Sequence, residues 1–350
     1  MKIVSIVGAR PQFIKCAPLS RELRKKHEEI LVHTGQHYDV VMSDIFFEEL
    51  GISKPDYELC IGSGSHGGQT GKMLIEIEKV LKKEEPEIVL VYGDTNSTLA
   101  AALAASKMNI RVAHVEAGLR SFDRSMPEEI NRVLTDHMSN LLLCPTKTAV
   151  ENLAKEGIIE GVHLVGDVMV DAVEYNRKVA KEKSHIIENL GLEKGKYLII
   201  TIHRPSNTDS RKNMANIIEA LKVSGKKILF PCHPRTEKYL RKYGLLDWMP
   251  SNVMLIEPVG YLDMLELMSC AEKILTDSGG IQKEAYILGV PCITLRKNTE
   301  WIETLENGWN VLVGADREKI VKAMKISPLI DIHKDLFGMV GVSKKILELF

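Results

Sequence analysis

The sequence predicts an α/β protein built from two Rossmann-like, doubly wound domains that face a cleft. Its 350 residues exceed the usual size of one hydrophobic core, and 45% of them are hydrophobic. Short β-branched runs alternate with amphipathic stretches, a pattern typical of parallel sheets covered by helices. A break in this alternation of strands and helices predicts one domain at 1–170 and a second at 171–340. A helix at 341–350 follows and can pack back on the first domain.

Each domain is expected to contain a series of short parallel strands. In the first half, strands are predicted at 3–7, 30–33, 88–92, 112–115, 141–144 and 162–165. Helices are predicted at 11–26, at 39–50, from the end of residues 93–96 to 108, and at 146–156. After a charged helical stretch at 177–196, further strands are predicted at 197–202, 227–230, 253–256, 273–275, 292–295 and 311–313. Open α/β sheets bind ligands at the carboxyl ends of their strands, so the polar clusters there are the candidate sites.

Composition argues against several classes of function. A net charge of −1 and an aromatic content of 5% argue against a nucleic-acid partner. The N-terminal apolar run is too short for a signal peptide and no later run is long enough to span a bilayer, so no membrane association is expected. The six cysteines never form C-x-x-C and H-E-x-x-H is absent, which predicts a reducing cytoplasm and no metal site.

Two glycine motifs are rejected as cofactor sites. Residues 62–67 match G-x-G-x-x-G, but they do not follow the opening strand of a βαβ unit, and no acid ends a strand about twenty residues later. Gly71-Lys72 lacks both the Walker spacing and its Ser or Thr. The chain is therefore expected to use no NAD, ATP or other cofactor, and residues 62–71 are interpreted as a flexible lid.

Asp94 and Glu128 are candidate acid/base residues of the first domain. Asp94 follows a predicted strand, and Glu128 lies where a helix is expected to begin. Both also have a structural interpretation, since Asp94 can cap the helix that follows it and Glu128 can be the capping-box partner of Ser125.

Glu116 is the third candidate acid, at the end of the strand predicted at 112–115. It lies between the apolar residues Val115 and Ala117, where burying an unpaired charge is costly. Its structural alternative is an ion pair with Arg120 or Arg132.

Arg10 and Lys15 are predicted to bind an anion. They lie at the start of a helix that directly follows the first strand, where unpaired N–H groups and the helix dipole attract negative charge. Cations at this end of a helix oppose the dipole, which favours a functional role over the alternative of two solvated surface cations.

Residues 276–285 of the second domain form a matching candidate site. Gly279 and Gly280 let backbone N–H groups approach a phosphate, Ser278 adds a hydroxyl, and a carboxylate such as Glu284 can bind both hydroxyls of a ribose. The structural alternative is an N-capped helix after a tight turn.

Two histidine-containing segments follow strands of the second domain. His203-Arg204-Pro205 and His233-Pro234-Arg235 each combine a His with an Arg, which suggests contacts to a diphosphate. Single histidines often only pack, so His203 alone is taken as a site residue.

Four segments resemble motifs of the non-hydrolysing UDP-N-acetylglucosamine 2-epimerases: V-G-A-R-P-Q-F-I-K, Y-G-D-T-N-S-T-L-A, H-V-E-A-G-L-R with P-E-E-I-N-R, and T-D-S-G-G-I-Q-K-E-A. The resemblance implies a GT-B fold, a homodimer, and interconversion of UDP-GlcNAc and UDP-ManNAc in the cytoplasm. It also implies that the reacting centre is lined by Arg10, Lys15, Asp94, Glu116, Glu128 and His203. Diphosphate and ribose would be bound by Ser278, Gly279, Gly280 and Glu284, and uracil by the segment from Val259 to Met264.

The chemistry of this reaction agrees with the residues. The C2 hydrogen of a hexosamine is not next to a carbonyl, so a carboxylate cannot simply remove it. Without NAD, UDP must leave across C1–C2 to give a glycal and then add back with protonation on the other face. This route needs anion binding and more than one acid/base group. The rival functions are a hydrolysing epimerase, a GT-B glycosyltransferase and a nucleotide-sugar sensor without turnover.

Overall fold

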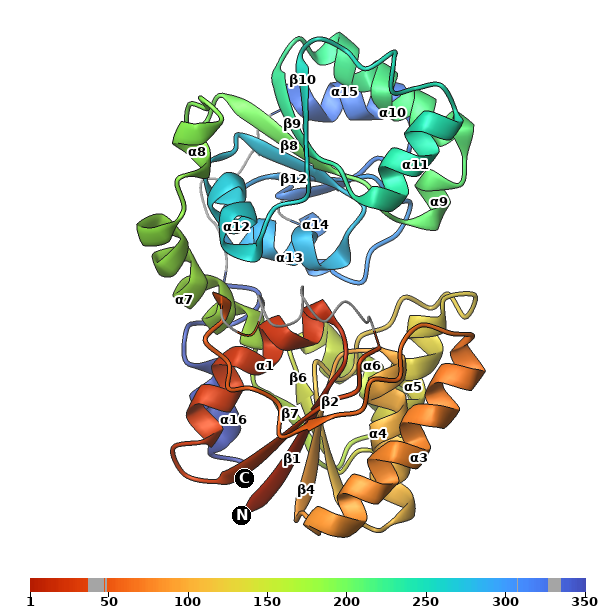
Figure 1. Ribbon diagram of the computed structural model, residues 1–350, viewed down its shortest axis with the longest axis vertical. Helices are drawn as coiled ribbons and strands as arrows, with labels where there is room; N and C mark the ends of the chain where they lie inside the picture. The colour runs from red at the N-terminus through yellow and green to blue at the C-terminus, as the bar shows by residue number, and fades with distance from the viewer. Residues whose placement is uncertain (37–46, 48, 307, 327–334) are drawn as a thin grey trace. The chain divides into compact units, whose positions relative to one another are not determined.

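The computed structural model describes residues 1–36, 47, 49–306, 308–326 and 335–350, which form two compact units. Unit 1 comprises residues 1–174 together with 337–350, and unit 2 comprises residues 175–336. The corresponding sequence prediction places the boundary at residue 170 and assigns 337–340 to the second domain. Both units combine parallel strands with helices, which confirms the predicted α/β class (Figure 1).

Unit 1 contains a seven-stranded parallel sheet in the order β3-β2-β1-β4-β5-β6-β7. Its strands are β1 (Lys2–Val7), β2 (Glu28–His33), β3 (Tyr57–Glu58), β4 (Ile88–Tyr92), β5 (Arg111–Val115), β6 (Leu141–Cys144) and β7 (Val162–Leu164). Every residue of β4 and β6 is buried, as expected for parallel strands covered on both faces. The two-residue strand β3 is absent from the sequence prediction, because it is too short to show a hydrophobic pattern.

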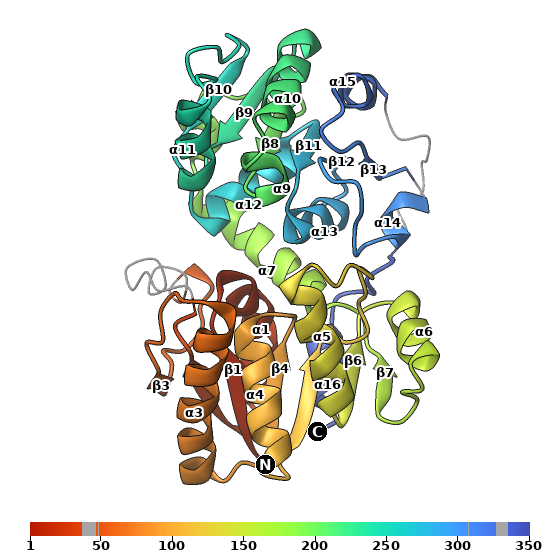
Figure 2. The same ribbon diagram turned by 90° about the vertical axis from the view of Figure 1, so that its right-hand side faces the viewer.

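Helices cover both faces of this sheet. They are α1 (Arg10–Leu23), α3 (His66–Glu84), α4 (Asn96–Lys107), α5 (Pro127–Met138), α6 (Lys147–Lys155), the first part of α7 (Val168–Lys183) and α16 (Val342–Leu347). Figure 2 looks onto α3, α4 and α5, which pack side by side on one face. The C-terminal helix α16 packs against α1 on the other face. The helix predicted at 39–50 lies largely outside the described residues.

Unit 2 contains a six-stranded parallel sheet in the order β10-β9-β8-β11-β12-β13. Its strands are β8 (Tyr197–Thr201), β9 (Lys227–Pro231), β10 (Val253–Ile256), β11 (Lys273–Thr276), β12 (Cys292–Thr294) and β13 (Asn310–Leu312). Its helices, beyond the second part of α7, are α8 (Ile186–Asn189), α9 (Pro205–Thr208), α10 (Arg211–Ser224), α11 (Pro234–Lys242), α12 (Tyr261–Cys270), α13 (Gly279–Ile287), α14 (Glu303–Glu306) and α15 (Arg317–Lys325).

The segment at 62–71 is not a lid loop throughout, because α3 begins at His66. Ser65 is the N-cap, and its Oγ accepts the backbone N–H of Gly68. The buried Gln69 side chain donates to the carbonyl oxygens of Gly62 at 2.7 Å and Gln36 at 3.1 Å. The expectation of a loop is therefore wrong for residues 66–71, where a cap and a buried amide support a helix despite its glycines.

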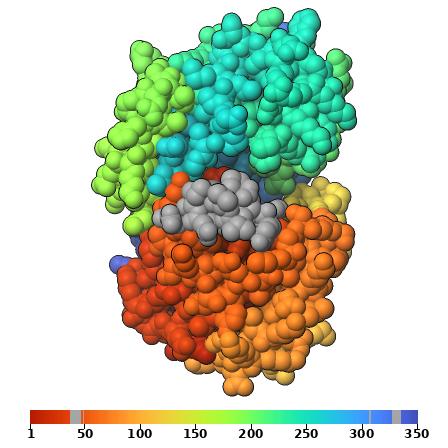
Figure 3. All heavy atoms as spheres, in the orientation of Figure 1, coloured from red at the N-terminus to blue at the C-terminus, as the bar shows by residue number. Residues whose placement is uncertain are grey.

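The outer surface of α3, orange in Figure 3, carries charged side chains. Exposed ion pairs join Glu76 to Lys79 and Glu78 to Lys82 at helical spacing. Among the residues that the structure describes, no helix has the length and apolar character needed to cross a membrane. The same residues contain no cluster of three or more His, Cys, Asp or Glu side chains suited to a metal ion.

Each sheet contains a point at which the strand order reverses direction. In unit 1 this point lies between β1 and β4, and in unit 2 it lies between β8 and β11. Loops that leave two such strands diverge to opposite faces of the sheet, which opens a crevice at their carboxyl ends where α/β proteins bind ligands. Arg10 and Asp94 follow β1 and β4, and His203 and Ser278 follow β8 and β11. The topology thus brings these four predicted residues to the reversal points of their sheets.

Candidate active site

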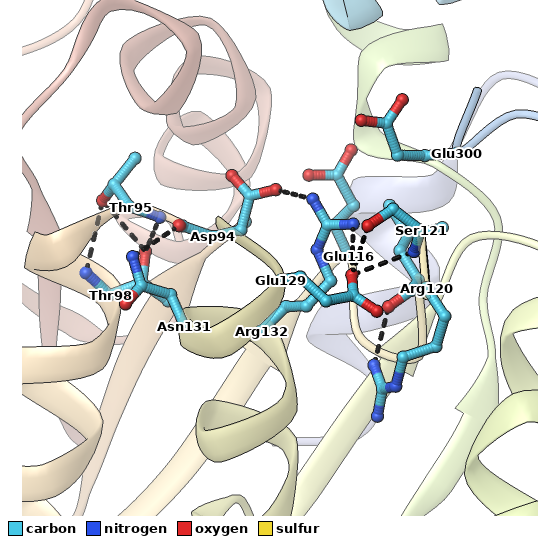
Figure 4. A network of polar contacts seen from close by, with 12 residues as sticks. Asp94, Thr95, Thr98, Glu116, Arg120, Ser121, Glu129, Asn131, Arg132 and Glu300 are labelled. Carbon is cyan, nitrogen blue, oxygen red and sulfur yellow. Dashed lines mark hydrogen bonds and ion pairs between the residues drawn. The ribbon is translucent and has the colours of Figure 1, made fainter. Parts of the chain in front are cut away.

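Asp94 lies in the loop after β4 and is held by an arginine of α5. Its carboxylate forms an ion pair with Arg132, whose guanidinium also contacts Glu129 at 3.0 Å (Figure 4). The alternative reading of Asp94 as a helix cap is wrong, because Thr95 is the N-cap of α4 and accepts the N–H of Thr98. Asp94 keeps about a third of its side chain exposed to solvent and remains accessible to a ligand.

Glu116 follows β5 and has an unusual backbone conformation. Its φ of 75° lies in the left-handed region, which costs a non-glycine residue free energy and is most often found at functional sites. Its side chain is 6% exposed and forms an ion pair with Lys15 of α1. Arg120, one of the two alternative partners considered from the sequence, instead pairs with Asp136 and Glu156.

Gly93 allows Lys15 and Glu116 to meet next to Asp94. A Cβ atom at this position would lie 3.1 Å from Lys15 Nζ and 3.2 Å from Glu116 Oε2, and the φ of 64° is itself unfavourable for other residues. Three predicted site residues, one from α1 and two from the loops after β4 and β5, are therefore gathered around one glycine.

Glu128 lies in the first turn of α5, half-buried, but it is not part of a capping box. The N-cap of α5 is Met126, without a side-chain cap, and Ser125 Oγ instead donates to Asp123 at 2.6 Å. Glu128 lies four residues before Arg132, so both project from the same side of α5. It is therefore on the face of α5 that contacts Asp94.

Arg10 is the first residue of α1 and is exposed. The buried Gln12 supports this turn, since its Oε1 accepts the N–H groups of Gly8 at 2.8 Å and Ala9 at 3.1 Å. Its Nε2 donates to the carbonyl oxygen of Tyr92 at 2.9 Å, which ties the turn after β1 to the end of β4. Sequence reasoning missed Gln12, although a polar residue among apolar ones in a helix is a usable signal.

A buried polar network underlies the two acids and was also missed. Asp136 of α5 contacts His114 Nδ1 at 2.7 Å and Arg120 at 2.6 Å, and Arg120 in turn binds Glu156 at 2.7 Å. His114, Arg120 and Asp136 are all buried. His114 stands in a strand between apolar residues, and this pattern alone does not reveal its partner.

This network predicts that unit 1 is sensitive to acid. Burial alone raises the pKa of Asp136, but the charges and hydrogen bonds of His114 and Arg120 outweigh it and hold the pKa below its usual value. The carboxylate therefore stabilises the fold above the unfolded pKa of about 3.9. This stabilisation is lost as the pH falls through the lower folded pKa. Asp136→Asn is expected to flatten the pH dependence of the unfolding free energy below about pH 4, measured by urea unfolding. An unchanged slope would contradict this.

In unit 2, a buried carboxylate organises the His203 loop. Asp277 is fully buried and accepts the backbone N–H groups of His203 at 3.0 Å and Arg204 at 3.1 Å. It also accepts the side-chain amide of Asn207 at 3.0 Å. The loop after β8 is thus attached to the end of β11. The sequence alone predicts no role for Asp277.

The His203 ring lies at the edge of this loop. Burial lowers the pKa of His203, and the nearby Asp277 carboxylate opposes this only in part. At neutral pH the imidazole is therefore mainly neutral and able to donate one N–H. The centroids of the His203 and His233 rings are 6.2 Å apart, so the two predicted histidine segments lie close together. Arg235 instead pairs with Asp209 at 2.6 Å.

The turn after β11 begins α13 as the sequence predicts. Ser278 is the N-cap of α13 and its Oγ accepts the N–H of Ile281 at 3.5 Å, so the structural reading of an N-capped helix holds. A Cβ atom on Gly279 or Gly280 would meet only ordinary contacts, at 3.6 and 3.9 Å. Packing within the chain therefore does not require glycine here. Glu284 is buried in α13.

The segment predicted to bind uracil lies in unit 2 after β10. Val259 lies in the loop before α12 and is half-buried, and Met264 is a buried residue of α12.

The chain is similar to known proteins over most of its length. A model of the UDP-N-acetylglucosamine 2-epimerase family matches residues 21–349. A Methanococcus maripaludis UDP-N-acetylglucosamine 2-epimerase homolog is 58% identical, covering 99% of both chains. A Pseudomonas aeruginosa protein named UDP-2,3-diacetamido-2,3-dideoxy-D-glucuronate 2-epimerase is 47% identical, again covering 99% of both chains.

The likeness extends to the three-dimensional structure. The crystal structure of the Methanocaldococcus jannaschii UDP-GlcNAc 2-epimerase in complex with UDP-GlcNAc and UDP matches with a TM-score of 0.92 at 49% identity. It covers 100% of this chain and 99% of that chain, in agreement with the predicted GT-B type of fold. The chain therefore belongs to the UDP-N-acetylglucosamine 2-epimerase family.

Proposed function

We propose that the protein reversibly converts UDP-GlcNAc into UDP-ManNAc by eliminating and re-adding UDP through a 2-acetamidoglucal, without hydrolysis. The observation that carries this proposal is the cluster of Lys15, Asp94 and Glu116 at the reversal point of the first sheet. Two carboxylates held by cations next to a positively polarised helix start suit a reaction that moves a proton while a diphosphate leaves.

In the first half-reaction, the C2–H and C1–O bonds break. A carboxylate takes the C2 proton, the C2–H electron pair forms the C1=C2 double bond, and UDP leaves with the C1–O electrons. In the second half-reaction, an acid protonates C2 on the opposite face and UDP re-forms the C1–O bond. We assign the proton transfers jointly to Asp94, Glu116 and Glu128. Each face of C2 needs its own proton donor or acceptor, and these acids come from the loop after β4, the turn after β5 and the first turn of α5.

The remaining groups stabilise the departing UDP. Arg10, Lys15 and His203 supply positive charge or N–H donors for the diphosphate, where negative charge develops in the transition state. Ser278, Gly279 and Gly280 open α13, and the absence of a packing reason for the glycines supports backbone approach to a phosphate. Glu284 is proposed to bind the ribose hydroxyls, and the segment from Val259 to Met264 the uracil.

The Pseudomonas aeruginosa relative points to a second candidate substrate. Its name specifies a UDP-sugar with a second acetamido group and a carboxylate. Epimerisation at C2 needs the same elimination in both sugars. The two nucleotide sugars should therefore be compared directly in one assay. A clear preference for the diacetamido glucuronate would replace UDP-GlcNAc as the substrate while leaving the elimination mechanism intact.

The decisive experiment is NMR of the chain incubated with UDP-GlcNAc in deuterated water. The expected result is UDP-ManNAc with deuterium at C2, deuterium also in the recovered UDP-GlcNAc, and no free ManNAc. Accumulation of ManNAc and UDP would assign a hydrolysing enzyme. Unchanged UDP-GlcNAc without exchange would contradict the epimerase proposal and favour a glycosyltransferase or a sensor. Light scattering of the same sample tests the accompanying proposal of a homodimer.

A further inference from the structure

The turn that presents Glu116 is strained and depends on outside support. Glu116 has a φ of 75° and Gly118, two residues later, a φ of 81°. A Cβ atom on Gly118 would overlap the carbonyl oxygen of Ala149, so the turn is also pressed closely against α6. Conformations of this kind persist only when the surrounding structure fixes them strongly.

Asp136 binds this turn on both sides of Glu116. Its Oδ2 accepts the backbone N–H of Gly118 at 3.1 Å, and its Oδ1 contacts the ring of His114 at 2.7 Å. The fixed points are thus two residues before and two residues after the acid. No part of the Asp136 side chain is exposed, so these bonds form away from water, where their geometry is well defined.

His114 extends the same support to Asp94. Its Nε2 lies 2.7 Å from the carbonyl oxygen of Gly93, the residue before Asp94. A carbonyl oxygen only accepts hydrogen bonds, so Nε2 is the donor. The ring therefore bridges the ends of β4 and β5. Arg120, bound to Glu156 at 2.7 Å, contacts Asp136 at 2.6 Å and fixes the carboxylate from the other direction.

We infer that Asp136 is a positioning residue, which through Gly118 and His114 holds Glu116 and Asp94 at the spacing that proton transfer requires. The inference rests on the proposed function, which assigns the proton transfers to these acids. Asp136 is buried beneath the acids and touches no solvent, so it acts on the reaction only through them. Its loss should lower kcat while leaving nucleotide binding by the residues of unit 2 intact.

The test uses the full chain with Asp136→Asn. The amide keeps the shape of the carboxylate but replaces one acceptor oxygen with a donor, which faces either the Gly118 N–H or the His114 ring. The expected result is a folded protein in which kcat for C2 exchange falls about 10- to 100-fold, because small displacements of reacting groups have effects of this size. KM for UDP-GlcNAc should change by no more than about twofold.

A second variant keeps the proposal testable if Asp136→Asn does not fold. In His114→Asn, the side-chain amide can still donate to Asp136 but cannot reach Gly93. A fall in kcat at constant KM is again expected, since Asp94 loses its support.

Asp171→Asn is the matched control. Asp171 accepts the N–H groups of Gly341 at 2.6 Å and Ser343 at 2.7 Å in the same unit, without contact to the acids. It is expected to lower Tm while kcat is retained.

The outcomes separate the two proposals. Folded Asp136→Asn and His114→Asn proteins with kcat close to that of the parent chain would overturn the positioning role. A loss of activity that appears only as a rise in KM would do the same. Failure of the parent chain to exchange the C2 hydrogen would instead contradict the proposed function.

Discussion

Replacing Glu116 with glutamine is expected to reduce exchange of the C2 hydrogen with solvent by about 10²- to 10⁴-fold, the usual contribution of a general acid or base. The amide cannot take up or release a proton at neutral pH. It also removes the negative charge that pairs with Lys15. Integration of the C2–H resonance of UDP-GlcNAc in deuterated water measures the rate directly.

Glu151→Gln is the control for this experiment. Glu151 is an exposed residue of α6 and is expected to leave the exchange rate unchanged. Circular dichroism should establish that both variants are folded. Retained exchange in a folded Glu116→Gln protein would remove Glu116 from the chemistry and leave Asp94 and Glu128 as the candidate acids.

Replacing Asp277 with alanine is expected to destabilise unit 2 more than any other substitution considered. Asp277 is fully buried and satisfies the N–H groups of His203 and Arg204 together with the Asn207 amide. Each buried donor left unpaired costs about 1–3 kcal/mol, so a total of at least about 3 kcal/mol is expected. For a domain of this size, that loss lowers Tm by about 6–12 °C.

The same substitution should weaken UDP binding, because the His203 loop loses its attachment to β11. Calorimetry supplies both the thermal transition of unit 2 and the affinity for UDP. Asp316→Ala is the comparison, since Asp316 caps α15 at the surface and its loss should cost only about 1 kcal/mol. An Asp277→Ala protein as stable as Asp316→Ala would show that the three donors find other partners.

The order of the elements and the position of the candidate acids follow from local patterns. Apolar runs of four to six residues are long enough to mark parallel strands such as β4 and β6, and their burial is the same on both faces. Asp94, His203 and Ser278 directly follow such strands, so their place at the carboxyl edge of a sheet is predictable without coordinates.

Short local motifs were less reliable at element ends. Ser125 and Glu128 have the spacing of a capping box, yet the N-cap is the next residue, Met126, so that α5 begins at Pro127, and Ser125 binds Asp123. The glycines at 62–71 suggested a loop, yet Ser65 and Gln69 support a helix from His66. In both cases side-chain contacts in the folded chain outweighed a preference that extends over only a few residues.

Only the folded chain decides which charges pair. Lys15 and Glu116 are 101 residues apart, and Asp94 and Arg132 are 38 apart, so neither pairing is a local pattern. Arg120 is closer in sequence to Glu116 than Lys15 is, yet it binds Asp136 and Glu156. The attraction between two charges depends on their distance in space and not on their separation along the chain. Their partners are therefore determined by which loops the parallel sheet brings together at one edge. Burial contributes as well, because a charged group removed from water needs a partner within the protein.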